Sequence, residues 1–156
     1  MANKFAFLNK HIIKAKPIWK EITDKRGDQI ARFHIHYFDP DLAESKNRQA
    51  NVHKAMDPAE LDLLNRLLKD NLNEGEFEKS GSLMAAYLFD LGQVTDWKFD
   101  NVEKAPAFTR ANFIEFAATD IGQSCVLSLY LLCRSWRVFE PKKADPKIAE
   151  NEAEKN

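Results

Sequence analysis

The first 38 residues show the alternation of apolar and polar side chains that is typical of β-strands. Residues 11–22 are rich in isoleucine and contain Trp19, and strands favour such side chains. Pro17 has no amide hydrogen, so this strand is expected at a sheet edge or at a bulge. Residues 29–38 alternate well, and Gly27 between the two segments is free to take a positive φ in a turn. We therefore expect a β-hairpin over residues 11–38, whereas residues 1–9 either dock or fray.

A three- and four-residue spacing of leucines replaces the alternation after residue 56. Asp57 is the expected N-cap, Pro58 takes the first helical position, and Glu60 completes a capping box. Gly75 is the expected end of this helix. The apolar stripe of the helix consists of Leu61, Leu64, Leu68 and Leu72, widened by Leu63 and Leu67. This stripe is either core or a partner-binding face, and core is the interpretation that we favour.

Weaker patterns lie on either side of this helix. Residues 39–56 are mostly polar, and from residue 41 on they form either a weak helix or a mobile arm. Residues 82–91 predict a further helix, which Gly92 ends. Trp97 and Phe99 then alternate with polar residues, as in a short strand.

The stretch 106–136 predicts two more helices with a break near Asp120. Thr109 is expected to cap the first helix and Asp120 the second, because their side-chain oxygens can accept from free amides in the first turn. The second helix, over residues 121–138, is apolar on nearly every face between residues 125 and 133. Such a helix is buried, either in its own core or against a partner, and the pattern alone does not assign its faces.

The last helix also bears on the location of the protein. Its uninterrupted apolar run covers about ten residues, whereas a transmembrane helix needs roughly 20. Cys125 and Cys133 lie too far apart along it to form a disulfide with each other. Buried free thiols are typical of a reducing cytoplasm, and the first ten residues show no signal-peptide pattern. We expect a cytoplasmic protein that does not bind a membrane.

Composition is that of one ordinary globular domain. The chain has 156 residues, of which 44% are hydrophobic and 11% aromatic, enough for a real core. Residues 140–156 are rich in Lys, Glu, Ala and Asn and predict a disordered tail. The patterns together predict an α+β fold for residues 1–139, with an N-terminal β-hairpin followed by a small bundle of about four helices.

Charge is nearly balanced overall but uneven along the chain. The net charge is −1, and residues 1–27 carry seven basic and two acidic residues, so that segment is +5 and the remainder −6. A protein that binds nucleic acid through its phosphates is usually basic, so we expect no nucleic-acid partner. The basic segment either faces a partner or is simply a solvated face, which is the interpretation that we favour.

Two histidines are the main candidates for metal chemistry. His34 and His36 lie on one face of the second predicted strand, together with Arg32. The opposite face carries Ala31, Phe33, Ile35 and Tyr37. With a third ligand from His11 or His53 the two histidines could hold a metal ion, but a polar outer face of the hairpin explains them more simply.

Motifs of catalysis are missing from the sequence. It has no Gly-x-Ser-x-Gly motif and no glycine-rich phosphate loop, and thiols in apolar surroundings are poor nucleophiles. We expect a protein that is not an enzyme, without catalytic residues, metal or cofactor.

Several features gather in residues 83–138. They are Trp97, the step Pro106-x-Phe108-Thr109-x-x-Asn112-Phe113 into a helix, and a last helix entered through Ile121-Gly122. In these features the chain resembles the tail assembly chaperones of long-tailed bacteriophages. It departs from them in two respects, because Ala107 lengthens the Pro-Phe-Thr step by one residue and the last helix is richer in leucine.

The resemblance implies a binding function and brings no catalytic residues. It implies that the chain binds the long, hydrophobic tape measure protein in the bacterial host's cytoplasm and keeps it soluble while subunits of the major tail protein gather. Apolar helices would supply the groove for a helical segment of that partner. The expected partner-binding residues are Phe108, Phe113, Val126, Leu127, Leu129, Tyr130, Leu131 and Trp136.

Two other functions stay open at this point. One is a structural tail-tube or head–tail joining component, in which the hairpin would build contacts between subunits. The other is a small metal-dependent enzyme that uses His34 and His36.

Overall fold

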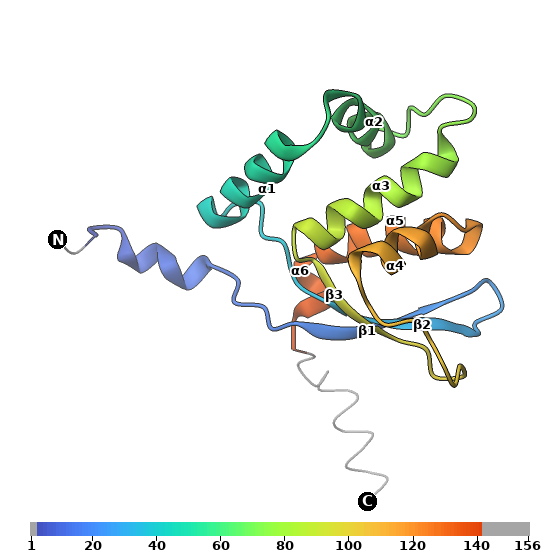
Figure 1. Cartoon of the computed structure of the whole chain (residues 1–156). Helices are drawn as coiled ribbons and strands as arrows, with labels where there is room; N and C mark the ends of the chain where they lie inside the picture. The colour runs from blue at the N-terminus through green and yellow to red at the C-terminus, as the bar shows by residue number, and fades with distance from the viewer. Residues whose placement is uncertain (1–2, 142–156) are drawn as a thin grey trace, which may run out of the picture.

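The fold is a three-stranded antiparallel sheet with helices packed on one of its faces (Figure 1). The structure, a computed structural model, describes residues 3–141. The strands are β1 (Ile18–Thr23), β2 (Gln29–Ile35) and β3 (Val94–Lys98), and β2 lies between the other two. The helices are η1 (Ala6–His11), α1 (Ala43–Ala55), α2 (Pro58–Leu68), α3 (Phe77–Asp90), α4 (Arg110–Ala117), α5 (Asp120–Cys133) and α6 (Trp136–Phe139). This architecture confirms the α+β class, and β3 contains the Trp97 of the predicted short strand.

The hairpin is confirmed, but its first strand is shorter than expected. Pairing begins with Ile18 opposite Ile35, and the preceding residues contain the 3-10 helix η1 instead of a strand. Pro17 explains this start, because it cannot donate a ladder hydrogen bond. The turn is closed by the carboxylate of Asp24, which accepts from the amides of Arg26 and Asp28 at 2.8 and 3.0 Å. Gly27 in this turn has a φ of 85°, as expected.

His34 and His36 are half-buried, so the expectation that they would be largely exposed was wrong. The reason is β3, whose Thr95 places its hydroxyl oxygen 2.9 Å from a ring nitrogen of each histidine. Burial lowers the pKa of His36, and the charges of His34 and Arg48 add to this effect.

The core lies between the inner face of the sheet and helices α3, α4 and α5. β2 contributes Ala31, Phe33 and Ile35, all fully buried. From the helices come Leu83, Met84, Ala85, Tyr87, Leu88, Phe113, Ala117, Val126, Leu129 and Cys133. Helix α3 packs against α2, α4 and α5, and it is therefore the central helix of the layer.

Helix α2 begins as predicted and ends earlier. The carboxylate of Asp57 accepts from the amide of Ala59 at 3.1 Å, and Pro58 follows at the first helical position. The helix ends at Leu68 instead of near Gly75. Leu64 is buried and Leu63 and Leu67 pack against the core, whereas Leu68 is 41% exposed. The buried face thus lies on the side of the predicted stripe that Leu63 and Leu67 widen, and Leu68 is left at its edge, because α2 packs on α3.

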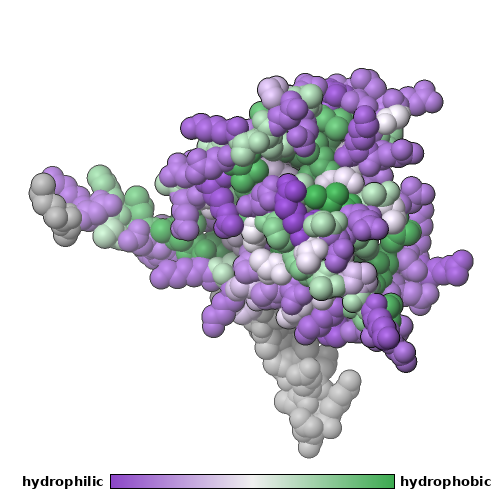
Figure 2. Space-filling view, viewed as in Figure 1, coloured by the Kyte–Doolittle hydropathy of each residue, from purple (hydrophilic) through white to green (hydrophobic). Residues whose placement is uncertain are grey.

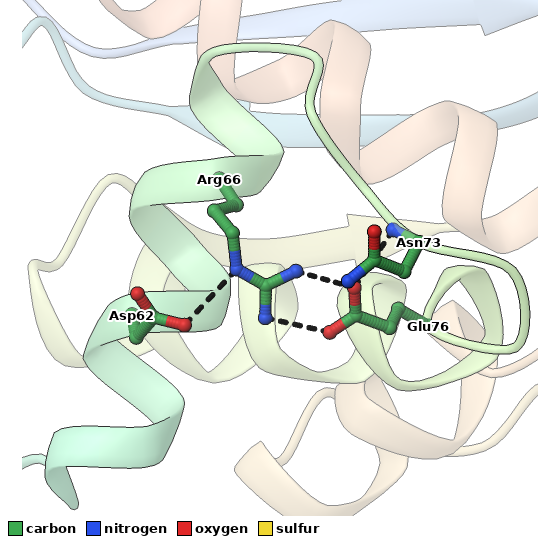
Figure 3. Close-up of polar contacts among 4 residues, drawn as sticks. All are labelled: Asp62, Arg66, Asn73 and Glu76. Carbon is green, nitrogen blue, oxygen red and sulfur yellow. Dashed lines mark hydrogen bonds and ion pairs between the residues drawn. The ribbon is translucent and has the colours of Figure 1, made fainter.

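An ion-pair network holds the loop after α2 (Figure 3). Both terminal nitrogens of Arg66 donate to the carboxylate of Glu76, and its Nε donates to Asp62 at 3.0 Å. The amide of Asn73 also donates to Glu76, at 2.7 Å. Arg66 lowers the pKa of Glu76 to about 2, with a further contribution from the Asn73 amide. Arg66 thereby ties the end of α2 to the start of α3.

Residues 43–55, the predicted weak helix or mobile arm, form helix α1. None of its residues is buried, as the polar sequence requires. It is attached through His53, whose Nε2 lies 2.9 Å from the hydroxyl oxygen of Tyr87, and through Val52, which packs against the core.

Of the two predicted helix caps near the C-terminus, one is confirmed and the other was wrong. Thr109 caps α4, because its hydroxyl oxygen accepts from the amide of Asn112 at 3.0 Å. The side-chain amide of Asn112 donates to the carbonyl of Ala107 at 2.9 Å. This contact differs from a capping box, in which the side chain bonds to the backbone amide of the cap residue itself. Asp120 is not the cap of α5, because Thr119 accepts from the amide of Gly122 at 3.0 Å. Asp120 is already the first helical residue.

The predicted continuous helix over residues 121–138 is two helices. α5 ends at Cys133, and α6 begins at Trp136 after a short break. At the break, the Arg134 guanidinium lies 4.1 Å from the ring centre of Phe38 and 4.6 Å from that of Tyr130. These cation–π contacts pack Arg134, the residue after α5, against Tyr130 of the same helix and against Phe38, which follows β2. The predicted disordered tail, 140–156, lies outside the described residues apart from its first two.

Candidate functional site

The eight predicted partner-binding residues do not form one surface. Phe113, Val126 and Leu129 are fully buried, so in this structure their side chains are not accessible to a partner. Phe108, Leu127 and Tyr130 are half-buried and pack against the core. Only Leu131 and Trp136 are exposed, to 68% and 38%.

The structure also settles which face of α5 belongs to the core. Val126, Leu129 and Cys133 are buried in the core, where α5 packs mainly on α3 and α4. The sequence pattern could not assign the faces because α5 is apolar on several sides, and its packing against α3 depends on residues far away in the chain.

Phe108 and Phe113 belong to an aromatic cluster that joins β3 to α4. The ring centres of Phe108 lie 5.2 Å from those of both Trp97 and Phe113. The indole N–H of Trp97 donates to the carbonyl of Pro106 at 2.8 Å. The Trp and Pro-x-Phe elements, on which the resemblance to tail assembly chaperones rests, therefore have a structural role in this chain.

A largely apolar groove lies between α5 and the β1–β2 turn. We call it the α5 groove; its volume is about 350 Å³, and its lining residues are Ile22, Thr23, Asp24, Lys25, Arg26, Ile30, Ile121, Ser124, Cys125 and Ser128. Ile121 is 55% exposed at its edge. One residue could have signalled this groove in the sequence: Ile121, which lies outside the apolar core positions of α5.

Charge at the α5 groove is mainly positive. Lys25 and Arg26 are exposed, whereas the carboxylate of Asp24 is already bonded to the turn amides. An apolar side chain that has an acidic neighbour would therefore fit this groove best, because its neighbour could pair with the two cations.

Both cysteine thiols are buried and free. Burial raises the pKa of Cys125 to about 11 and that of Cys133 to about 12. A thiol with so high a pKa is almost wholly protonated at neutral pH, so neither is a good nucleophile.

We expect iodoacetamide to leave both thiols unmodified in the folded protein at pH 7.5. In denaturant both should react, because unfolding restores water around the sulfur atoms and brings the pKa back toward about 8.5. Mass spectrometry of the intact chain checks this by counting added groups. Rapid labelling of either cysteine without denaturant would show that the thiol is accessible.

The other histidines do not complete a metal site with His34 and His36. His53 contacts Tyr87, and His11 lies on the N-terminal 3-10 helix. Within residues 3–141, no three His, Cys, Asp or Glu side chains are grouped so that they could hold a metal ion.

Among the helices of residues 3–141, no single one is long and apolar enough to cross a membrane. Helices α4 and α5 meet the criteria of length and composition only as a bent pair, with an angle of 112° between them, and their buried residues pack inside the fold.

Comparisons with known proteins complete the description of the site. No protein family, curated protein or solved structure was found to match the chain.

Proposed function

We propose that this chain binds an apolar, helical segment of a partner protein in the α5 groove and keeps that segment soluble. Of the known functions, this one corresponds best to that of a tail assembly chaperone, with the tape measure protein as partner in the bacterial cytoplasm. The observation that carries the proposal is the α5 groove, whose lining includes the half-buried Ile22 and Ile30 and the exposed Ile121.

The size and chemistry of the groove support a protein segment as its ligand. A volume of about 350 Å³ accommodates one or two large side chains of a helix. Ser124 and Ser128 on the α5 side offer hydroxyl groups at the rim, where a bound helix could still be solvated. This is the helix-in-groove mode of recognition, with Ile121 as the exposed apolar contact.

Ile121→Glu is the first variant that tests the proposal. The carboxylate would stand at the mouth of the α5 groove, and the variant should no longer keep an apolar tape measure fragment soluble on co-expression. The melting temperature should change little, because Ile121 is more than half exposed. Leu68→Glu is a matched control, since this leucine is also exposed but lies on α2, outside the groove.

Ser128→Trp is a second variant, in which the indole fills the groove without adding charge. It should also abolish solubilisation of the fragment. If both groove variants still solubilise it, the binding site lies elsewhere. If the unmodified chain never solubilises such a fragment, the chaperone function itself is wrong, and a tape measure gene should then also be absent just downstream.

A structural component of a phage tail is the second candidate function. The observation that favours it is an N-terminal segment that projects from the sheet (Figure 1). Components that assemble into tubes or rings use such segments to contact a neighbouring subunit.

A further inference from the structure

The N-terminal arm, defined as residues 3–17, extends away from the rest of the molecule (Figure 1). Each of residues 3–14 is exposed to solvent. Five large apolar side chains are among them: Phe5, Phe7, Leu8, Ile12 and Ile13. Figure 2 shows hydrophobic surface interspersed with hydrophilic surface along the projection. This is an unusual amount of apolar surface for a segment without a covering element.

No residue from 3 to 14 belongs to the core of the described residues or packs against it, and Ala15 is the first arm residue that does. The backbone hydrogen bonds that form η1 run between arm residues, such as the Leu8 amide to the Phe5 carbonyl at 2.9 Å. The rings of Phe5 and Phe7 are tilted by 55° relative to each other, with their centres 6.0 Å apart. A 3-10 helix of six residues is marginal in water by itself, so a stable arm requires a surface that covers its apolar side chains.

Charge indicates what kind of surface this is. The arm carries Lys4, Lys10, Lys14 and Lys16 and no acidic residue, so its charge is +4. Residues 18–141 carry 15 basic and 20 acidic residues, a net charge of −5. The body of a second copy therefore attracts the arm and also offers apolar grooves, which a nucleic acid does not.

One groove of the body matches the arm in both polarity and charge. We call it the aromatic groove; it has a volume of about 280 Å³ and is lined by Trp97, Phe99, Pro106, Asn112, Glu115, Phe116 and Thr119. Glu115 is exposed, and the lining includes no basic residue. The α5 groove, by contrast, has Lys25 and Arg26 at its rim and would repel the lysines of the arm.

The arm and the aromatic groove lie at opposite ends of the sheet. The arm enters β1 at Ile18, which is in register with Ile35 and, through it, with Val94 at the start of β3. The groove lies beyond the other end of β3, around Trp97 and Phe99. In Figure 1 the arm also points away from the loop that follows β3.

We propose that the arm of one copy docks in the aromatic groove of a second copy, with Phe5 and Phe7 on its aromatic floor and an arm lysine paired with Glu115. Because donor and acceptor surfaces differ, the association is head-to-tail and builds rings or open chains, not a closed two-fold dimer. The inference does not depend on the proposed function, because the α5 groove takes no part in it.

The double substitution Phe5→Ser with Phe7→Ser tests the apolar half of the contact. The full-length protein should self-associate as its concentration rises in sedimentation velocity, and the variant should do so about 30-fold more weakly or not at all, as for the loss of interface hot spots. Its melting temperature, measured where both proteins are dissociated, should be unchanged. Phe77→Ser is the matched control, because Phe77 is 53% exposed on α3 and belongs to neither surface.

A charge exchange tests the polar half. Glu115→Lys alone, and Lys4→Glu with Lys10→Glu alone, should each weaken self-association. A mixture of these two proteins should form a one-to-one complex, because the carboxylates introduced into the arm of one then meet the ammonium group introduced into the groove of the other. Failure of the mixture to associate while both parents are monomeric would overturn the groove assignment.

Three other results would overturn the proposal as a whole. One is a protein that stays monomeric at every concentration. Another is self-association that survives the Phe5 and Phe7 substitutions. The third is a monomer that binds anionic lipid vesicles through Phe5 and Phe7, which would make the arm a membrane-surface segment.

Discussion

Phe113→Ala is expected to lower the free energy of unfolding by about 3–5 kcal/mol, enough to leave little folded protein. The side chain is fully buried, and its ring centre lies 5.2 Å from that of Phe108 and 6.0 Å from that of Trp97. Alanine would leave a cavity at the point where β3, the loop after it and α4 meet. The rings of the cluster could not close this cavity without moving the Trp97 indole away from the Pro106 carbonyl.

Urea denaturation followed by tryptophan fluorescence measures this effect, because Trp97 lies in the same cluster. Phe77→Ala serves as the control, since that phenylalanine is 53% exposed and its loss should cost less than about 1 kcal/mol. A Phe113→Ala protein of normal stability would mean that the cluster is not packed as described. Reduced partner binding by this variant would not identify a binding site, because unfolding would explain it.

Gly122→Ala is expected to destabilise the protein by about 3 kcal/mol or more, at the upper end of what overpacking costs. A Cβ on Gly122 would lie 1.8 Å from the carbonyl oxygen of Phe116, far inside contact distance. That oxygen cannot easily retreat, because it also accepts from the Thr119 hydroxyl at 2.8 Å. The corner between α4 and α5 would have to open.

Gly81→Ala should have a similar effect on the neighbouring helix crossing. Its Cβ would lie 2.3 Å from the carbonyl oxygen of Ala117, which is backbone and not a flexible side chain. Melting temperatures of both variants, with Ser128→Ala as a control on the exposed side of α5, check the prediction. Variants as stable as the control would show that α3, α4 and α5 do not approach this closely.

Features that depend on residues a few positions apart could be predicted from the sequence. The caps by Asp57 and Thr109 and the turn at Gly27 are local, because each is made by a side chain or a φ angle within one turn of the chain. The hairpin followed from the period of two in residues 29–35. The cap of α5 was misplaced by one residue because Thr119 and Asp120 are adjacent and both are good caps.

Features that depend on distant residues were decided only by the tertiary structure. Val126 and Leu131 lie on one apolar helix, yet one is fully buried and the other 68% exposed, because only one side of α5 faces α3 and α4. The α5 groove needs Ile22 and Ile121, about a hundred residues apart.

The exposure of the N-terminal arm was also decided by the tertiary structure. Its apolar residues predict a strand that pairs or a segment that docks, and the pattern contains no sign that they are left exposed by the described part of the chain, residues 3–141. Alternation and spacing report which side chains prefer burial, and they do so from local geometry alone. Which of those side chains are actually buried is decided by the surfaces that distant parts of the fold bring against them. The exposure of the arm, the α5 groove and the aromatic groove are all results of the tertiary structure for this reason.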